Sequence, residues 1–104
     1  MVVRIVKMTF KADQIDQFKE TFEKFKIAIR NQPGCSHLKL IQDLHDPTVF
    51  CTYSHWEREE DLNNYRCSAT FKEVWPLTKA LFSAKPEAWS SQIIDEQAEQ
   101  IVPI

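Results

Sequence analysis

The sequence predicts a single α+β domain with the element order β-α-β-β-α-β and an antiparallel sheet that carries its helices on one face. β-Branched, strand-like segments occur near residues 1–10, 35–42, 48–56 and 88–94, and segments with helical periodicity lie between them. The 104 residues contain no internal repeat and no low-complexity linker. We therefore expect one domain over residues 1–95 and a tail over 96–104.

The first strand is apolar on both faces, and a long amphipathic helix follows it. Alternation puts Val2, Val6, Met8 and Phe10 on one face and Val3, Ile5, Lys7 and Thr9 on the other. Asp13 is the expected N-cap of a helix that runs to about Asn31. Its apolar stripe repeats every three or four residues, at Ile15, Phe18, Phe22, Phe25 and Ile29. Pro33 and Gly34 end this helix, and the only glycine of the chain suits a turn with positive φ.

Two strands, at 35–42 and 48–56, are joined by a polar turn with Asp46 and Pro47. The acidic run 57–61 suits the first turn of a helix. Ser68 can cap a further helix that ends near Phe82, with Pro76 expected to kink or divide it. The inward residues of that helix are expected to be Phe71, Val74, Trp75, Thr78 and Leu81. With a last strand at 88–94, the arrangement is the split βαβ, or ferredoxin-like, fold.

The sheet face away from the helices is expected to be apolar as well, with residues such as Val3, Ile5, Cys51 and Tyr53. A chain this short covers such a face most directly with a second copy of itself. We expect a homodimer packed sheet on sheet, to which the apolar residues Ile101, Val102 and Ile104 contribute.

Composition excludes several classes of function. A net charge of -2 offers no footprint for nucleic acid or an anionic membrane. No apolar run is long enough to span a bilayer and no signal peptide is visible, so a cytoplasmic protein is expected. One glycine excludes a glycine-rich phosphate loop, and three cysteines argue against a disulfide framework.

Histidines and cysteines give no strong metal pattern. Cys35 and His37 are expected on one strand face, with His55 on the neighbouring strand, but their spacing matches no zinc motif. We expect no metal. His55 should alternate to the face opposite Trp56.

Aromatic residues crowd the second half of the chain, at Trp56, Tyr65, Phe71, Trp75, Phe82 and Trp89. Core packing explains most of them, since large rings dominate small cores by area. A cavity walled by these rings, with the hydroxyls of Thr52, Ser54 and Tyr65, would also suit a flat aromatic ligand.

Several short motifs occur together in an order that resembles the antibiotic biosynthesis monooxygenase (ABM) family. They are Gly34-Cys35, Trp56-Glu57, Tyr65 nine residues after Trp56, and Ser68-x-x-Phe71-Lys72. The likeness runs from the first strand to about Trp89. It implies a ferredoxin-like domain that forms a dimeric α+β barrel, and oxidation of quinols or polycyclic phenols by dioxygen without metal or flavin. One branch of the family degrades haem instead.

Carrying the family pattern across residue by residue separates these activities. Trp56 matches a widely shared tryptophan, which implies a structural role at the strand end. The Tyr65 position is often His in quinol-oxidising relatives, and their second His falls on Thr70. The haem branch uses an Asn that falls near Val6 or Lys7 and an axial His that falls on Trp75, so haem degradation is not expected.

Two hypotheses remain open. The first is a cofactor-independent monooxygenase acting on a small quinol or phenol with dioxygen. Tyr65 would hydrogen-bond the phenolate or the departing proton, while the substrate would contact Trp56, Thr52, Ser54, Phe71 and Trp75. The second is a non-catalytic ligand-binding or structural barrel, which the missing histidines favour.

Overall fold

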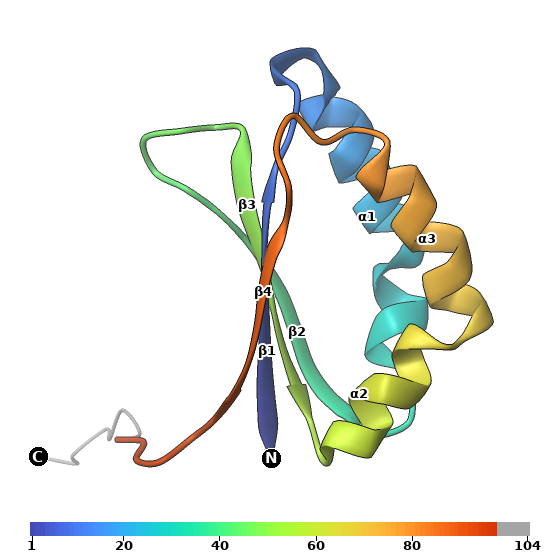
Figure 1. Cartoon of the computed structure of the whole chain (residues 1–104), viewed down its shortest axis with the longest axis vertical. Helices are drawn as coiled ribbons and strands as arrows, with labels where there is room; N and C mark the ends of the chain where they lie inside the picture. The colour runs from blue at the N-terminus through green and yellow to red at the C-terminus, as the bar shows by residue number, and fades with distance from the viewer. Residues whose placement is uncertain (98–104) are drawn as a thin grey trace, which may run out of the picture.

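A computed structural model describes residues 1–97, in which a four-stranded antiparallel sheet is covered by helices on one face only (Figure 1). The strand order is β2-β3-β1-β4, as the ferredoxin-like prediction requires. The elements are β1 (Val2–Thr9), η1 (Ala12–Gln14), α1 (Ile15–Arg30), β2 (Cys35–Gln42), β3 (Val49–Trp56), α2 (Glu59–Arg66), α3 (Ala69–Lys79) and β4 (Glu87–Gln92). Ile101, Val102 and Ile104, expected at a dimer contact, lie outside the described residues. No helix within residues 1–97 has both the length and the apolarity to cross a membrane.

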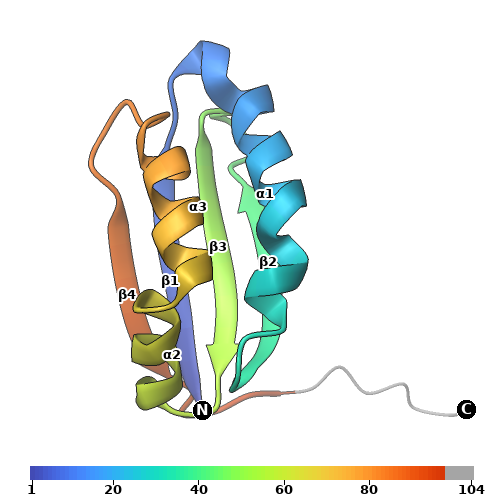
Figure 2. The ribbon, with the colours of Figure 1, turned by 90° about the vertical axis from the view of Figure 1, so that its right-hand side faces the viewer.

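The helices α1 and α3 lie side by side over the sheet, and α2 covers the end of the sheet near the N-terminus (Figure 2). Phe10, Phe18 and Phe50 form the centre of the core beneath them, and at most 2% of each is exposed. The rings of Phe10 and Phe18 stack with their centroids 4.0 Å apart. Such a dry, aromatic core fixes the distance between the sheet and the helices.

Strand register assigns the side chains to the two faces of the sheet. Arg4 pairs with Ser54 on one side and with Ser90 on the other, and this row faces the helices. The next row has the opposite orientation and contains Lys39, Tyr53, Ile5 and Trp89. Trp89 is therefore not part of the aromatic group between sheet and helices, and 47% of its surface is exposed.

The predicted N-cap of the first helix is wrong. Asp13 lies inside the 3₁₀ turn η1, and Gln14 precedes α1 without any side-chain cap. The Gln14 amide donates instead to the Lys11 carbonyl at 2.9 Å. A 3₁₀ turn of this kind satisfies amides at a helix start without a capping carboxylate.

Ser68 caps α3 as predicted, since its hydroxyl accepts a hydrogen bond from the Phe71 amide at 3.2 Å. Of the two effects predicted for Pro76, a kink or a division of the helix, the division does not occur, because α3 is continuous through this residue. Pro76 lies in the last turns of α3, where one missing amide removes a single backbone hydrogen bond and the fixed φ of proline still suits the helix. The helix ends at Lys79, before the predicted Phe82.

A bulge at the start of β2 separates two residues that were predicted to share a face. Cys35 pairs with Trp56 and His37 pairs with His55, so Ser36 is an extra residue in the strand. Cys35 is therefore buried against Trp56 and Leu62, whereas His37 lies on the face away from the helices. The expectation that Cys35 and His37 lie on one face is wrong for this reason.

The face away from the helices carries a group of polar and aromatic side chains among its apolar ones. His55 lies on this face, as predicted, and its Nε2 is 2.8 Å from the Tyr53 hydroxyl. The rings of His37 and His55 are 5.0 Å apart, and the Lys39 ammonium lies 4.7 Å from the centre of the Tyr53 ring. We call this face, with Val3, Ile5, His37, Lys39, Cys51, Tyr53, His55 and Trp89, the open face.

Candidate functional site

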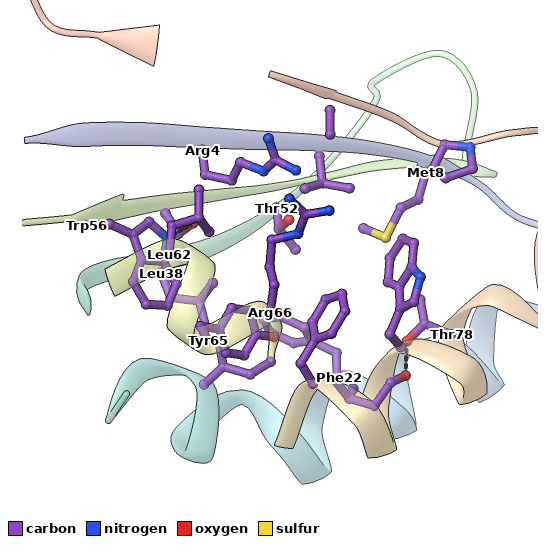
Figure 3. Close-up of a pocket in the computed structure, with 18 of the residues that line it drawn as sticks. Arg4, Met8, Phe22, Leu38, Thr52, Trp56, Leu62, Tyr65, Arg66 and Thr78 are labelled. Carbon is purple, nitrogen blue, oxygen red and sulfur yellow. Dashed lines mark hydrogen bonds between the residues drawn. The ribbon is translucent and has the colours of Figure 1, made fainter. Parts of the chain in front are cut away.

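A cavity of about 310 Å³ lies between the sheet and the helices. All six predicted site residues line it: Thr52, Ser54, Trp56, Tyr65, Phe71 and Trp75. Figure 3 labels Thr52, Trp56 and Tyr65 among them. The six residues converge because alternate residues of β3 point toward the helices, while Phe71 and Trp75 are one helical turn apart on α3. The volume is at the lower end of the range for small-molecule sites and suits a compact ligand of one or two rings.

The wall of the cavity is a continuous series of aromatic contacts. Tyr65 stacks on Trp56 with centroids 5.2 Å apart and meets the edge of Phe71 at 5.3 Å. Phe71 in turn stacks on Trp75 at 5.6 Å, with an angle of 12° between the rings. Only 1% of Trp56 is exposed, so this residue closes the core as well as bounding the cavity. The two interpretations of the aromatic cluster, core and pocket, therefore describe the same side chains.

Hydroxyl groups are few in this cavity, and two of them are already engaged. The Thr78 hydroxyl donates to the Val74 carbonyl at 2.9 Å. The Trp56 indole N–H donates to the Ser54 Oγ at 2.9 Å, and both side chains are buried. Because the Ser54 oxygen already accepts this hydrogen bond, Ser54 is better placed to donate a hydrogen bond to a ligand than to accept one. This bond also explains why a polar residue is tolerated next to Trp56 in a buried strand.

Tyr65 is a neutral hydrogen-bond donor and not a base. Burial of the phenol raises the pKa of Tyr65 well above its ordinary value of 10, and the Cys35 thiol adds a smaller effect in the same direction. Within residues 1–97 no hydrogen bond engages the Tyr65 hydroxyl, which leaves it available to a ligand in the cavity.

This pKa shift predicts a particular dependence of stability on pH. The unfolded chain ionises Tyr65 near pH 10, while the folded chain keeps it protonated to higher pH. The contribution of Tyr65 is thus fully present below pH 10 and is lost as pH rises toward the folded pKa. We expect the free energy of unfolding, measured by urea denaturation between pH 8 and 11, to fall less steeply above pH 10 in Tyr65→Phe than in the unmodified protein. Parallel curves would show that the phenol is not shielded from water.

Two cavity residues, Arg4 and Arg66, were not predicted from the sequence. Arg4 comes from the centre of β1 and donates from Nη1 to the Ser90 Oγ at 3.0 Å; Arg66 is the last residue of α2. Figure 3 shows both side chains extending to the same part of the cavity near Thr52. Burial, and secondly the positive charge of Arg66, lower the pKa of the Arg4 guanidinium. For Arg4, the sequence did contain a signal: it is the one charged residue on the helix-facing side of the first strand.

The histidines lie away from this cavity, since no histidine is among the residues that line it in the described part of the chain. His37 and His55 are on the open face, and His45 is in the turn before β3. Thr70, which takes the place of a second family histidine, accepts a hydrogen bond from the Gln32 amide at 3.3 Å. Any chemistry in the cavity therefore proceeds without an imidazole from this chain.

The family model for antibiotic biosynthesis monooxygenases (ABM) matches residues 1–75. The chain belongs to this family. No curated protein sequence shows significant similarity to it. The matched segment of the ABM domain extends from β1 into α3 and includes every predicted site residue.

Solved structures show the same fold over nearly the whole chain. A crystal structure of an antibiotic biosynthesis monooxygenase superposes with a TM-score of 0.86 and 20% identity, and covers 91% of this chain and 100% of its own. A conserved protein from Methanosarcina mazei Go1 gives 0.83 and 22%, covering 88% and 92%. Rv0793 from Mycobacterium tuberculosis gives 0.84 and 14%, covering 93% and 98%. At these identities the similarity establishes the ABM fold, while the chemistry has to be argued from the cavity.

Proposed function

We propose that this ABM-family protein is a cofactor-independent monooxygenase that oxidises a small quinol or phenol with dioxygen. The observation that carries the proposal is the cavity itself, which is walled by aromatic rings and offers the free Tyr65 hydroxyl. An electron-rich phenolate passes an electron to dioxygen directly, so the protein has to bind, orient and desolvate it. In the overall reaction, a hydroquinone and one dioxygen give a hydroxyquinone and one water.

The six predicted site residues have different roles in this reaction. Trp56, Phe71 and Trp75 exclude water and hold the ring of the substrate flat, which strengthens electrostatic interactions inside the cavity. Tyr65 donates its hydrogen bond to the phenolate oxygen and positions it. Because Tyr65 keeps its own proton, it does not take the proton of the substrate, which leaves to solvent before oxidation. Thr52 and Ser54 supply further polar contacts from β3.

Oxygen uptake tests the proposal. We expect the purified protein to accelerate oxygen consumption with at least one member of a panel of hydroquinones and naphthohydroquinones, by at least tenfold over the spontaneous rate. Tyr65→Phe should lower kcat by roughly tenfold, the loss of about one hydrogen bond to a charged group. The matched control is Tyr53→Phe, which removes the other tyrosine hydroxyl from the open face. A panel that shows only the spontaneous rate would refute the enzymatic role.

A second candidate is a non-catalytic ligand-binding barrel. The observation in its favour is that the cavity lacks a general base among the described residues: Tyr65 is held neutral and no histidine lines the walls. In this case aromatics would stabilise the protein against heat without oxygen uptake.

We also propose a homodimer in which the open faces of two copies pack together. The open face lies opposite α1 and α3 and is not covered by any helix of residues 1–97 (Figure 1). It carries Ile5 and the half-buried ring of Tyr53 beside the exposed ring of Trp89. A second copy is the occupant that the family resemblance implies, and a shared two-fold contact would shield these rings from water. The polar group of His37, Tyr53 and His55 would then lie within the contact, with its hydroxyl–imidazole bond already formed.

A further inference from the structure

Two guanidinium groups line one largely apolar cavity, and neither has an anionic partner among residues 1–97. In this part of the chain the Arg4 side chain forms one hydrogen bond, to the neutral Ser90 hydroxyl. Within residues 1–97 the cations that form ion pairs are Lys26 and Arg58. Neither Arg4 nor Arg66 therefore has a carboxylate within 4.0 Å in this part of the chain. Both line the same cavity as the aromatic wall.

This arrangement is unfavourable in the absence of a ligand. The two positive charges repel each other, and the partial burial of Arg4 weakens the screening of this repulsion by water, while Arg66 is exposed at the mouth of the cavity. The charge would be neutralised by one anion that reaches both groups. Arginine recognises planar carboxylates with paired N–H donors, which favours a carboxylate over a spherical ion in a flat aromatic site.

We propose that the ligand of this cavity is an aromatic acid: a hydroxylated ring that carries a carboxylate, with the acid group bound between Arg4 and Arg66 and the ring against Phe71 and Trp75. The inference rests on the proposed use of the cavity and names the class of its substrate. It also predicts the orientation of the bound ligand: Arg4 on β1 and Arg66 at the end of α2 bind the acid group, while α3 contacts the ring. A quinol of this class, 2,5-dihydroxybenzoate, is small enough for a site of about 310 Å³.

Binding without turnover tests the inference in the unmodified protein. Under anaerobic conditions, the Kd of 2,5-dihydroxybenzoate is compared by calorimetry with that of its neutral amide, which has the same shape. We expect the acid to bind on the order of ten to a hundred times more tightly, as for hydrogen bonds to charged groups. Equal affinities for the acid and the amide would overturn the inference, and this comparison does not depend on any variant being folded.

Variants then locate the acid group. Arg4→Gln and Arg66→Gln should each weaken binding of the acid about tenfold or more and leave the amide within a factor of about two. Lys72→Gln removes the same charge from an exposed position on α3 outside the cavity and should change neither value. If Lys72→Gln weakens binding of the acid as much as Arg4→Gln and Arg66→Gln do, only the net charge of the protein matters. That result would overturn the assignment of Arg4 and Arg66.

Oxygen uptake separates this inference from the proposed function. If the acid binds through the arginines, but neither the acid nor any hydroquinone of the panel consumes oxygen above the spontaneous rate, the inference holds and the monooxygenase proposal fails. If neutral quinols are oxidised while the acid binds no better than the amide, the monooxygenase proposal holds and the inference fails.

Discussion

Tyr53→Glu is expected to separate the proposed homodimer into monomers. Tyr53 lies in the middle of the open face, between Lys39 on β2 and Ile5 on β1. By two-fold symmetry the substitution introduces two carboxylates into the contact, and each buried charge without a partner costs several kcal/mol. We expect the dimer Kd to rise by at least about a hundredfold, or nearly 3 kcal/mol.

Sedimentation equilibrium at micromolar concentration measures this change. Tyr53→Phe is the matched control, because it keeps the ring and loses only the hydroxyl that contacts His55; it should remain a dimer. Circular dichroism shows whether Tyr53→Glu dissociates as a folded chain. If the unmodified protein is a stable monomer of 12.2 kDa, the proposed dimer is wrong.

Gly34→Ala should strongly destabilise the fold. Gly34 has a φ of +84° in the turn between α1 and β2, where a side chain costs about 1–2 kcal/mol. A Cβ there would also overlap with the Asp61 carboxylate, which is buried under this turn. Overpacking of this kind typically costs a further 1–3 kcal/mol or so. Asp61 bonds the Arg58 amide at the start of α2, so the overlap also displaces the helix that carries Tyr65.

Urea denaturation of Gly34→Ala and Gly34→Asn separates the two causes. Asparagine tolerates positive φ better than alanine but meets Asp61 in the same way. If backbone conformation dominates, Asn is the milder change; if the overlap dominates, the two variants are equally unstable. A free energy of unfolding for Gly34→Ala within about 0.5 kcal/mol of the unmodified protein would contradict this account of the turn.

Most of the fold and much of the candidate site could be predicted from the sequence. Simple periodicity places Thr52, Ser54 and Trp56 on one face of β3, and Phe71 and Trp75 on one face of α3. The periodicities of two and 3.6 residues hold within one regular strand or helix. Because α3 lies over the sheet that contains β3, the residues on their facing sides come together, and the predicted site residues therefore surround one cavity.

The predictions that failed depend on local departures from regularity. One extra residue, Ser36, reverses the face of Cys35 relative to His37, and nothing in its sequence neighbourhood marks a bulge. The alternation of apolar residues in β1 does not by itself predict that Arg4 lines the cavity. A charged side chain at an inward position is explained only once its surroundings, here Ser90 and Arg66, are known.

A crystal structure of the protein with 4-hydroxybenzoate would test the cavity as the substrate site most directly. The carboxyl group of this phenol blocks the carbon opposite its hydroxyl, so it cannot form the corresponding quinone and should remain bound. We expect its ring between the sheet and α3, with its hydroxyl within hydrogen-bonding distance of the Tyr65 hydroxyl. An empty cavity at saturating ligand, or a ring bound only on the open face, would contradict the proposed site.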